Sequence, residues 1–98
     1  MSPYTALVTD RTIEVDETLG HVQINMEAGP ATGSVHTVKW FAWTMTSAPP
    51  TVSGNVNQIE DPNSTAATMI QLGPTAVLPT EGEAVTWTFD GTQWVVTA

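Results

Sequence analysis

The sequence predicts an all-β fold, a compact antiparallel β-sandwich or β-barrel of about eight short strands. Three observations support this fold class. Threonine and valine, which favour strands, are abundant along the chain. Proline and glycine, seven of each, interrupt it at short intervals. No segment keeps a helical hydrophobic period, so we expect at most one short helical turn, at Ser64–Thr68.

Three short strands are expected in the N-terminal part of the chain. Tyr4–Val8 is a short edge strand or an arm, and Thr12–Asp16 and Val22–Met26 follow it. The link between the last two contains Gly20, which favours a hairpin between them. Alternation gives each of these two strands one apolar row: Ile13 and Val15 on the first, and Val22, Ile24 and Met26 on the second.

The middle of the chain predicts one long strand and several shorter ones. The long strand is Ser34–Thr44, which follows a loop rich in small residues. Shorter strands are expected around Asn55–Glu60 and at Met69–Leu72 and Thr75–Leu78. A polar loop at 61–64 and a turn at 80–83 complete this part of the chain.

The segment Ala84–Val96 predicts a hairpin, because Asp90-Gly91 separates two runs that alternate in polarity. If Asp90-Gly91 is a two-residue loop, the strand pairs are Phe89 with Thr92, Trp87 with Trp94, and Val85 with Val96. One face then carries Val85, Trp87, Phe89, Trp94 and Val96, and the other carries Thr86, Thr88, Gln93 and Val95. This strongly apolar face must be buried against another part of the molecule.

The chain is predicted to form one domain, residues 1–98, in which 1–9 is a possible docking arm and 10–98 is the sandwich or barrel core. The sequence contains no cysteine, which excludes disulfides and thiolate metal sites. The N-terminus lacks the basic and apolar regions of a signal peptide. No apolar run approaches the length of about 20 residues that spans a bilayer. We therefore expect neither signal-directed export nor a membrane anchor.

The charge balance limits the partners that the protein can bind. Two basic residues stand against ten acidic ones, which gives a net charge of −8. Nucleic acids and anionic membrane surfaces are bound by clustered lysine and arginine. The sequence therefore predicts neither as a partner.

Several acidic side chains lie close enough to suggest a site. Glu14 and Asp16 share one strand face, with Glu17 beside them, and such a group could bind Ca²⁺ or act as an acid–base pair. A simpler interpretation is the solvated face opposite the apolar row. Glu81 and Glu83 flank a turn and are interpreted in the same way.

The two histidines could serve as a base or as metal ligands. His21 follows a glycine and is expected to be exposed, whereas His36 is expected on the polar side of its strand. No spacing marks a catalytic triad. We therefore expect no catalytic residues, no metal site, no cofactor and no enzymatic activity.

The order of these elements resembles a β-rich module of tailed-bacteriophage virion proteins, found in fibres and in capsid-decorating (cement) proteins. Four segments carry the resemblance: TIEVDETLGHVQINM, AGPATGSVHTVKWF, NVNQIEDPN and PTAVLPTEGEAVTWTFDGTQWVV. They cover about Asp10 to Val96, and the terminal FDGTQWVV is the most specific. The resemblance implies a homotrimer on the virion, with a structural or adhesive role and no catalysis.

The sequence departs from this module at one strand. Where the module has two lysines and polar residues, this chain has Lys39-Trp40-Phe41-Ala42-Trp43, with Trp40 and Ala42 on one face and Phe41 and Trp43 on the other. A strand that is apolar on both faces is buried on both faces. A trimer axis or a partner surface would supply the second cover. Alternatively, Trp40 and Phe41 straddle the end of the strand and Trp43 caps the core.

The function expected from the resemblance is that of a capsid decoration protein. It would bind the lattice of the major capsid protein as a homotrimer, on the capsid exterior of the virion, and stabilise the head. The expected partner-binding residues are Pro3, Tyr4, Ala6, Val8, Trp40, Phe41 and Trp43.

The alternative is a carbohydrate- or receptor-binding module of a phage fibre or spike. In that case tryptophans would form a platform on which sugar rings stack, and the candidates are Trp40, Trp43, Trp87 and Trp94.

Overall fold

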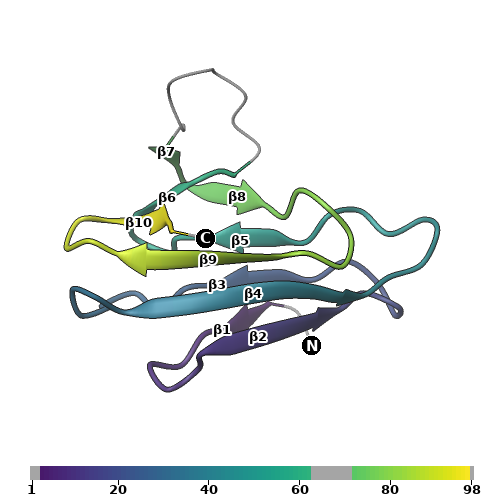
Figure 1. The fold of residues 1–98 in the computed structure, drawn as a ribbon, viewed down its shortest axis with the longest axis horizontal. Coiled ribbons are helices and arrows are strands. Elements are labelled where there is room, and N and C mark those ends of the chain that lie inside the picture. The colour runs from purple at the N-terminus through teal and green to yellow at the C-terminus, as the bar shows by residue number, and fades with distance from the viewer. Residues whose placement is uncertain (1–2, 63–71, 98) are drawn as a thin grey trace.

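The structure, a computed structural model, describes residues 3–62 and 72–97, and in these it contains strands and no helix (Figure 1). The all-β prediction is therefore confirmed, whereas the short helical turn predicted at 64–68 and residues 69–71 of a predicted strand lie outside the described residues. The strands are β1 (Tyr4–Thr5), β2 (Thr12–Asp16), β3 (Gln23–Asn25), β4 (Val35–Ala42), β5 (Thr51–Ser53), β6 (Gln58–Glu60), β7 (Leu72–Gly73), β8 (Thr75–Val77), β9 (Ala84–Phe89) and β10 (Gln93–Val96).

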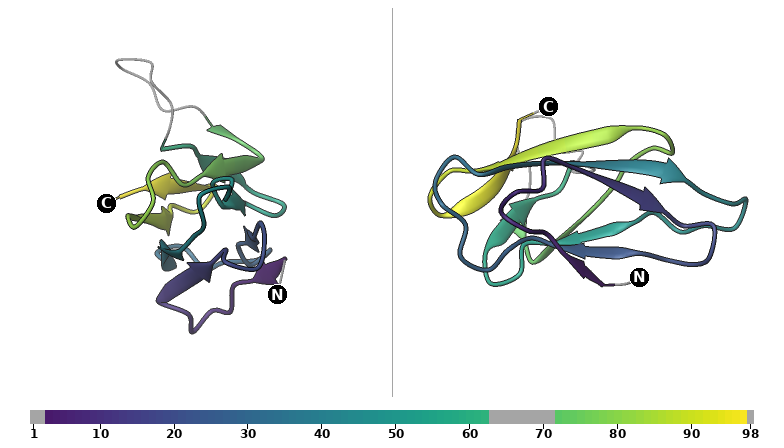
Figure 2. Two further views of the ribbon diagram at one scale, coloured as in Figure 1. Left: turned by 90° about the vertical axis from the view of Figure 1, so that its right-hand side faces the viewer. Right: turned by 90° about the horizontal axis from the view of Figure 1, so that it is seen from below.

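The strands form two sheets. The small sheet has the order β1-β3-β5-β8, and the large sheet has the order β2-β4-β9-β10-β6-β7. Figure 2 shows the two layers from the side. The prediction of purely antiparallel sheets is wrong, because β1 with β3, β3 with β5, β2 with β4, and β10 with β6 are parallel pairs.

The parallel pairs follow from the path of the chain. From β1 to β5 each strand lies in the sheet opposite its predecessor. The chain reverses at each crossing, so every second strand returns to the same sheet in the same direction. The predicted hairpin between Thr12–Asp16 and Val22–Met26 is therefore wrong: the first pairs with β4, and the second pairs with β1 and β5. Their apolar rows meet across the core instead of side by side. The sequence analysis also missed β5, a short strand between a proline pair and a glycine.

One hydrophobic core lies between the sheets. The predicted apolar rows of β2 and β3 are inside, and so is the apolar face of the last hairpin, with Val22 and Val96 only partly buried. The fully buried tryptophans are Trp87 and Trp94, and Trp40 is 3% exposed. On one side of the molecule β6 contacts β8, which draws the sheets together. On the other side β1 and β2 are the edge strands, and a groove of about 370 Å³ lies between them.

The terminal hairpin keeps its predicted faces but has a different register. Trp94 pairs with Phe89 and Val96 pairs with Trp87, and the Asp90 N–H donates to the Gln93 carbonyl at 3.0 Å. The two-residue loop is thus Gly91-Thr92, one position later than predicted. The pairing shifts by two residues, so the same side chains still share a face.

Asp90 fixes this turn. Its Oδ1 accepts the N–H groups of Thr92 at 2.9 Å and Gln93 at 3.0 Å, and Gly91 takes a positive φ of 111°. These backbone hydrogen bonds favour the ionised carboxylate and lower the pKa of Asp90 from its ordinary value of 3.8. Because the pKa of Asp90 is lower in the folded state than in the unfolded state, the carboxylate stabilises the fold at pH values above its ordinary pKa. This stabilisation disappears as the pH falls through the lowered pKa of the folded state.

We expect the stability difference between the wild type and Asp90→Ala to be constant from neutral pH down to about pH 5 and to narrow below about pH 4. Urea unfolding followed by circular dichroism at a series of pH values measures this difference. Asp90→Asn, which keeps an acceptor oxygen without the charge, is the control and should give a difference that varies less with pH. A difference between wild type and Asp90→Ala that is the same at pH 3 and pH 7 would contradict this role of the carboxylate.

Candidate docking surface

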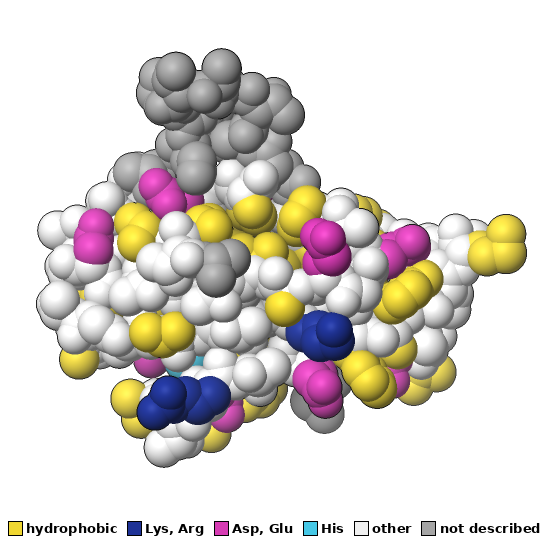
Figure 3. Space-filling view, in the orientation of Figure 1, with side chains coloured by type: hydrophobic (Ala, Val, Ile, Leu, Met, Phe, Trp, Pro, Cys, Tyr) yellow, Lys and Arg dark blue, Asp and Glu magenta, His cyan; other side chains and the backbone are white. Residues whose placement is uncertain are grey.

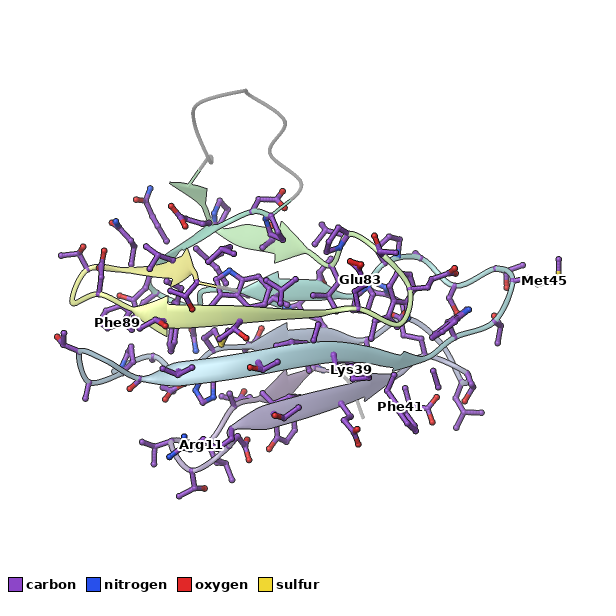
Figure 4. All side chains as sticks on the ribbon, viewed as in Figure 1. Arg11, Lys39, Phe41, Met45, Glu83 and Phe89 are labelled. Atoms are coloured by element: carbon purple, nitrogen blue, oxygen red, sulfur yellow. The ribbon has the colours of Figure 1, made fainter. Side chains whose placement is uncertain are left out.

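Large apolar side chains are exposed at one end of the sandwich. Leu19 in the β2–β3 link and Met45 in the β4–β5 link are fully exposed, while Phe41 and Trp43 at the end of β4 are 53% and 40% exposed. We call these four residues the apolar end. Figure 3 shows apolar surface on this right-hand side of the view, and Figure 4 labels Phe41 and Met45 there, opposite Arg11. Exposed apolar side chains grouped in this way are typical of interaction surfaces.

A buried glutamate joins the two links that carry this end. The Glu17 N–H donates to the Ala42 carbonyl at 2.9 Å, which continues the pairing of β2 with β4. Its Oε2 accepts the Val22 N–H at 2.8 Å and lies 3.2 Å from His21 Nδ1. The Ser47 hydroxyl reaches the Glu17 carbonyl at 3.5 Å. Glu17 thereby holds the β2–β3 link in a fixed shape against the β4–β5 link.

The burial of Glu17 was not predicted, although the sequence contained the signal. The notion of a solvated acidic face holds for Glu14 and Asp16, which are exposed. Glu17, in contrast, is 1% exposed, and its Oε1 is buried without a hydrogen-bond partner. It follows Ile13 and Val15 at the same spacing of two, so alternation continued past the strand end places it inside.

A β-bulge separates the exposed aromatics from the core. Val15 pairs with Trp40 and the next residue, Asp16, pairs with Ala42, so Phe41 is the extra residue of β4. Trp40 remains in the core, and its ring meets that of Trp43 edge-on at 6.2 Å. Within the single chain the inner face of this strand is covered, and the outer aromatics are left partly exposed.

The predicted partner-binding residues fall into two groups. Pro3, Tyr4, Val8, Phe41 and Trp43 are exposed, whereas Ala6 and Trp40 belong to the core. The exposed residues do not form one surface, because Val8 borders a pocket with Val35 at the start of β4, and Phe41 lies near the end of that strand. The N-terminal segment also lies on the protein's own fold: β1 pairs with β3, and the Ala6 N–H donates to the Asn25 carbonyl at 2.7 Å.

The two histidines differ in exposure, and the sequence analysis did not predict this difference. His21 is exposed as expected, but the placement of His36 on the polar side is wrong. His36 is 1% exposed, because it shares the inward parity of Val38 and Trp40 on β4. Its Nε2 lies 2.6 Å from Glu27 Oε1, and its Nδ1 lies 2.6 Å from the Asp10 carbonyl.

One chain of side chains resembles the arrangement that activates a hydroxyl nucleophile. The Thr51 hydroxyl lies 3.5 Å from His21 Nε2, and His21 Nδ1 faces Glu17. The first separation exceeds the roughly 2.6–3.2 Å over which such groups exchange a proton. Glu17 also accepts the Val22 N–H, so we interpret these three side chains as a structural support of the β2–β3 link. The absence of enzymatic activity stays a prediction.

In the described parts of the chain, 3–62 and 72–97, no three His, Asp or Glu side chains gather closely enough to hold a metal ion. The same residues include no helix with the length and apolarity that a bilayer crossing requires. No protein-family model and no curated protein sequence matches this chain.

Proposed function

We propose that the protein is a structural virion protein, a phage capsid decoration protein that binds the major capsid protein lattice as a homotrimer. The observation that supports this proposal is the apolar end, in which Leu19 and Met45 are as exposed as in an unfolded chain. Burying a side chain of this size contributes about 1.5–3 kcal/mol. A surface of this kind is therefore best explained by contact with another protein.

The mechanism would be mass action without chemistry. A protein that binds only the assembled lattice stabilises it by about 2.7 kcal/mol per site at a hundredfold excess over Kd. Three linked copies add avidity because the second and third contacts are intramolecular. The acidic surface, with a net charge of −8, keeps the free protein soluble before assembly.

Sedimentation equilibrium of the purified chain tests the trimer. We expect a mass three times that of the 10.4 kDa chain. The double variant Leu19→Ser/Met45→Ser should weaken assembly by at least tenfold, while Val56→Ser, which changes another exposed apolar side chain in the β5–β6 link, should leave it unchanged. A monomeric wild type at all concentrations would overturn the homotrimer.

Co-sedimentation tests the capsid partner. The chain is mixed with heads assembled from a phage major capsid protein, in compact and expanded forms. We expect the wild type to pellet with the expanded heads and the Leu19→Ser/Met45→Ser variant to remain in the supernatant. Equal recovery with and without heads would overturn the decoration role.

The alternative, a glycan- or receptor-binding module, has little surface on which to act. Trp40, Trp87 and Trp94 are buried, and only Trp43 is substantially exposed. Tryptophan fluorescence quenched by glycans, together with a failure to bind heads, would favour this alternative over decoration.

A further inference from the structure

A second surface, distinct from the apolar end, lies along the free edge of β2. This strand pairs only with β4 among the described residues and borders the open side of the sandwich. The Arg11 carbonyl accepts from Thr37, and the Glu17 N–H donates to Ala42, so the odd-numbered residues direct their backbone groups to β4. The N–H and C=O groups of the even-numbered residues, Thr12, Glu14 and Asp16, therefore point to the free edge.

A groove runs beside this edge. It has a volume of about 370 Å³ and lies between β2 and the strands β1 and β3 of the opposite sheet. Apolar side chains from both sheets line it: Ile13 and Val15 from β2, Ile24 from β3, and Val22 just before β3. An added strand would find backbone partners on β2 and apolar contacts on its inward side.

The rim of the groove is acidic. Asp10, Glu14 and Asp16 line it, together with Tyr4 and Thr12. Hydrogen bonds keep two of these carboxylates ionised: the Tyr4 hydroxyl lowers the pKa of Asp10, and the Thr18 hydroxyl lowers that of Asp16. Neither basic residue of the chain lines the groove: Arg11 stands between two lining residues, Asp10 and Thr12, without lining it. Lys39 pairs with Glu14 across β2 and β4, and its Nζ donates to the Gly82 carbonyl.

We propose that the free edge of β2 binds an extended segment of a basic partner protein as an added strand. Alternating small apolar residues of that segment would enter the groove, and the lysine or arginine residues between them would face Glu14 and Asp16. The charges argue against a second copy of this chain as the occupant, because each copy carries −8 and only two basic residues. The surface and its partner are independent of the trimer contact proposed above.

A synthetic peptide, acetyl-Lys-Val-Lys-Val-Lys-Val-Lys-amide, tests this proposal by titration into the full chain. We expect saturable binding at physiological salt, and slower hydrogen exchange at the amides of Thr12, Glu14 and Asp16. Exchange at Ile13 and Val15 should not change, because their amides already bond to β4. Slowing at all five amides, or at none, would overturn the proposal.

Two variants at one position separate the backbone contribution from the charge. Glu14→Thr removes the charge and keeps the N–H, and we expect about 3–5-fold weaker binding. Glu14→Pro also removes an N–H that points to the free edge, so the ladder with β4 stays intact and binding should fall at least tenfold further. Glu81→Thr, a charge change at an exposed turn outside the groove, is the matched control and should leave binding within twofold. Equal weakening by Glu14→Thr and Glu14→Pro, or by Glu14→Thr and Glu81→Thr, would show a general charge attraction instead of strand addition.

A backbone change in the peptide gives the same answer if Glu14→Pro does not fold. One peptide is N-methylated at its valines and another at its lysines. In an added strand only one of these two sets of N–H groups faces β2, so only one peptide should lose binding. A general charge attraction would treat the two peptides alike, and that result would overturn the proposal.

Discussion

Replacing Trp87 by alanine is expected to lower the free energy of unfolding by about 3–5 kcal/mol. Trp87 is fully buried on β9, between the sheets, and its indole N–H donates to the Glu60 carbonyl at 2.9 Å. The substitution leaves a large cavity and removes the partner of a backbone carbonyl at the end of β6. Because a domain of this size is stable by only about 5–15 kcal/mol, the loss is a large fraction of the total.

Trp43→Ala is the matched control for this prediction. It deletes the same side chain at a site that is 40% exposed, and we expect a loss of less than about 1 kcal/mol. Urea unfolding followed by far-ultraviolet circular dichroism measures both changes without relying on tryptophan emission. Similar losses for the two variants would mean that Trp43 belongs to the core, which would remove one of the two aromatics of the apolar end.

A milder substitution keeps the comparison measurable if Trp87→Ala does not fold. Trp87→Phe loses volume and the hydrogen bond to Glu60, whereas Trp94→Phe loses only volume, because the Trp94 indole N–H is buried without a partner. We expect Trp87→Phe to cost about 1 kcal/mol more than Trp94→Phe. An equal cost would contradict the role assigned to the Glu60 contact.

The faces of the strands could be predicted from the sequence, because a period of two places alternate side chains on one side whatever the neighbouring strand is. The rows of β2, β3 and the last hairpin were placed correctly for this reason. The hairpin register was not predicted correctly, because Asp90 can stand within the turn or just before it. Its hydrogen bonds to Thr92 and Gln93 determine which of these two registers forms. Both registers bury the same tryptophans.

The strand neighbours could not be predicted, because a glycine in a link permits either a hairpin or a crossing between sheets. The link after Asp16 makes a crossing, stabilised by the hydrogen bond from the Val22 N–H to the Glu17 carboxylate, and this places β2 and β3 in opposite sheets. Glu17 and His36 were both assigned to polar faces although each has inward parity. Those two predictions followed the polar character of the side chain. The position in the strand alternation would have predicted the burial correctly.

Removing His36 is expected to be the most costly change at a polar residue. Its two ring nitrogens face oxygens, the Asp10 carbonyl and Glu27 Oε1, each at 2.6 Å, and its ring lies 5.5 Å from that of Trp94. A carbonyl can only accept, so Nδ1 carries a proton, and the contact with Glu27 requires a second proton between Nε2 and Oε1. His36 thus ties the segment before β2 and the link after β3 to the start of β4.

His36→Phe should destabilise the fold by about 3–5 kcal/mol, because it leaves the largely buried Glu27 carboxylate without its partner. Glu27→Met should cost less, about 1–2 kcal/mol, because a neutral His36 still donates from Nδ1 to Asp10. The double variant should be more stable than His36→Phe alone, since it removes the Glu27 carboxylate that His36→Phe leaves buried without a partner. Urea unfolding of the four proteins gives the coupling free energy of the pair. If the two single losses simply add, the charge of Glu27 is satisfied by solvent, and the core at this point is held by the packing of the imidazole against Trp94 instead of by the ion pair.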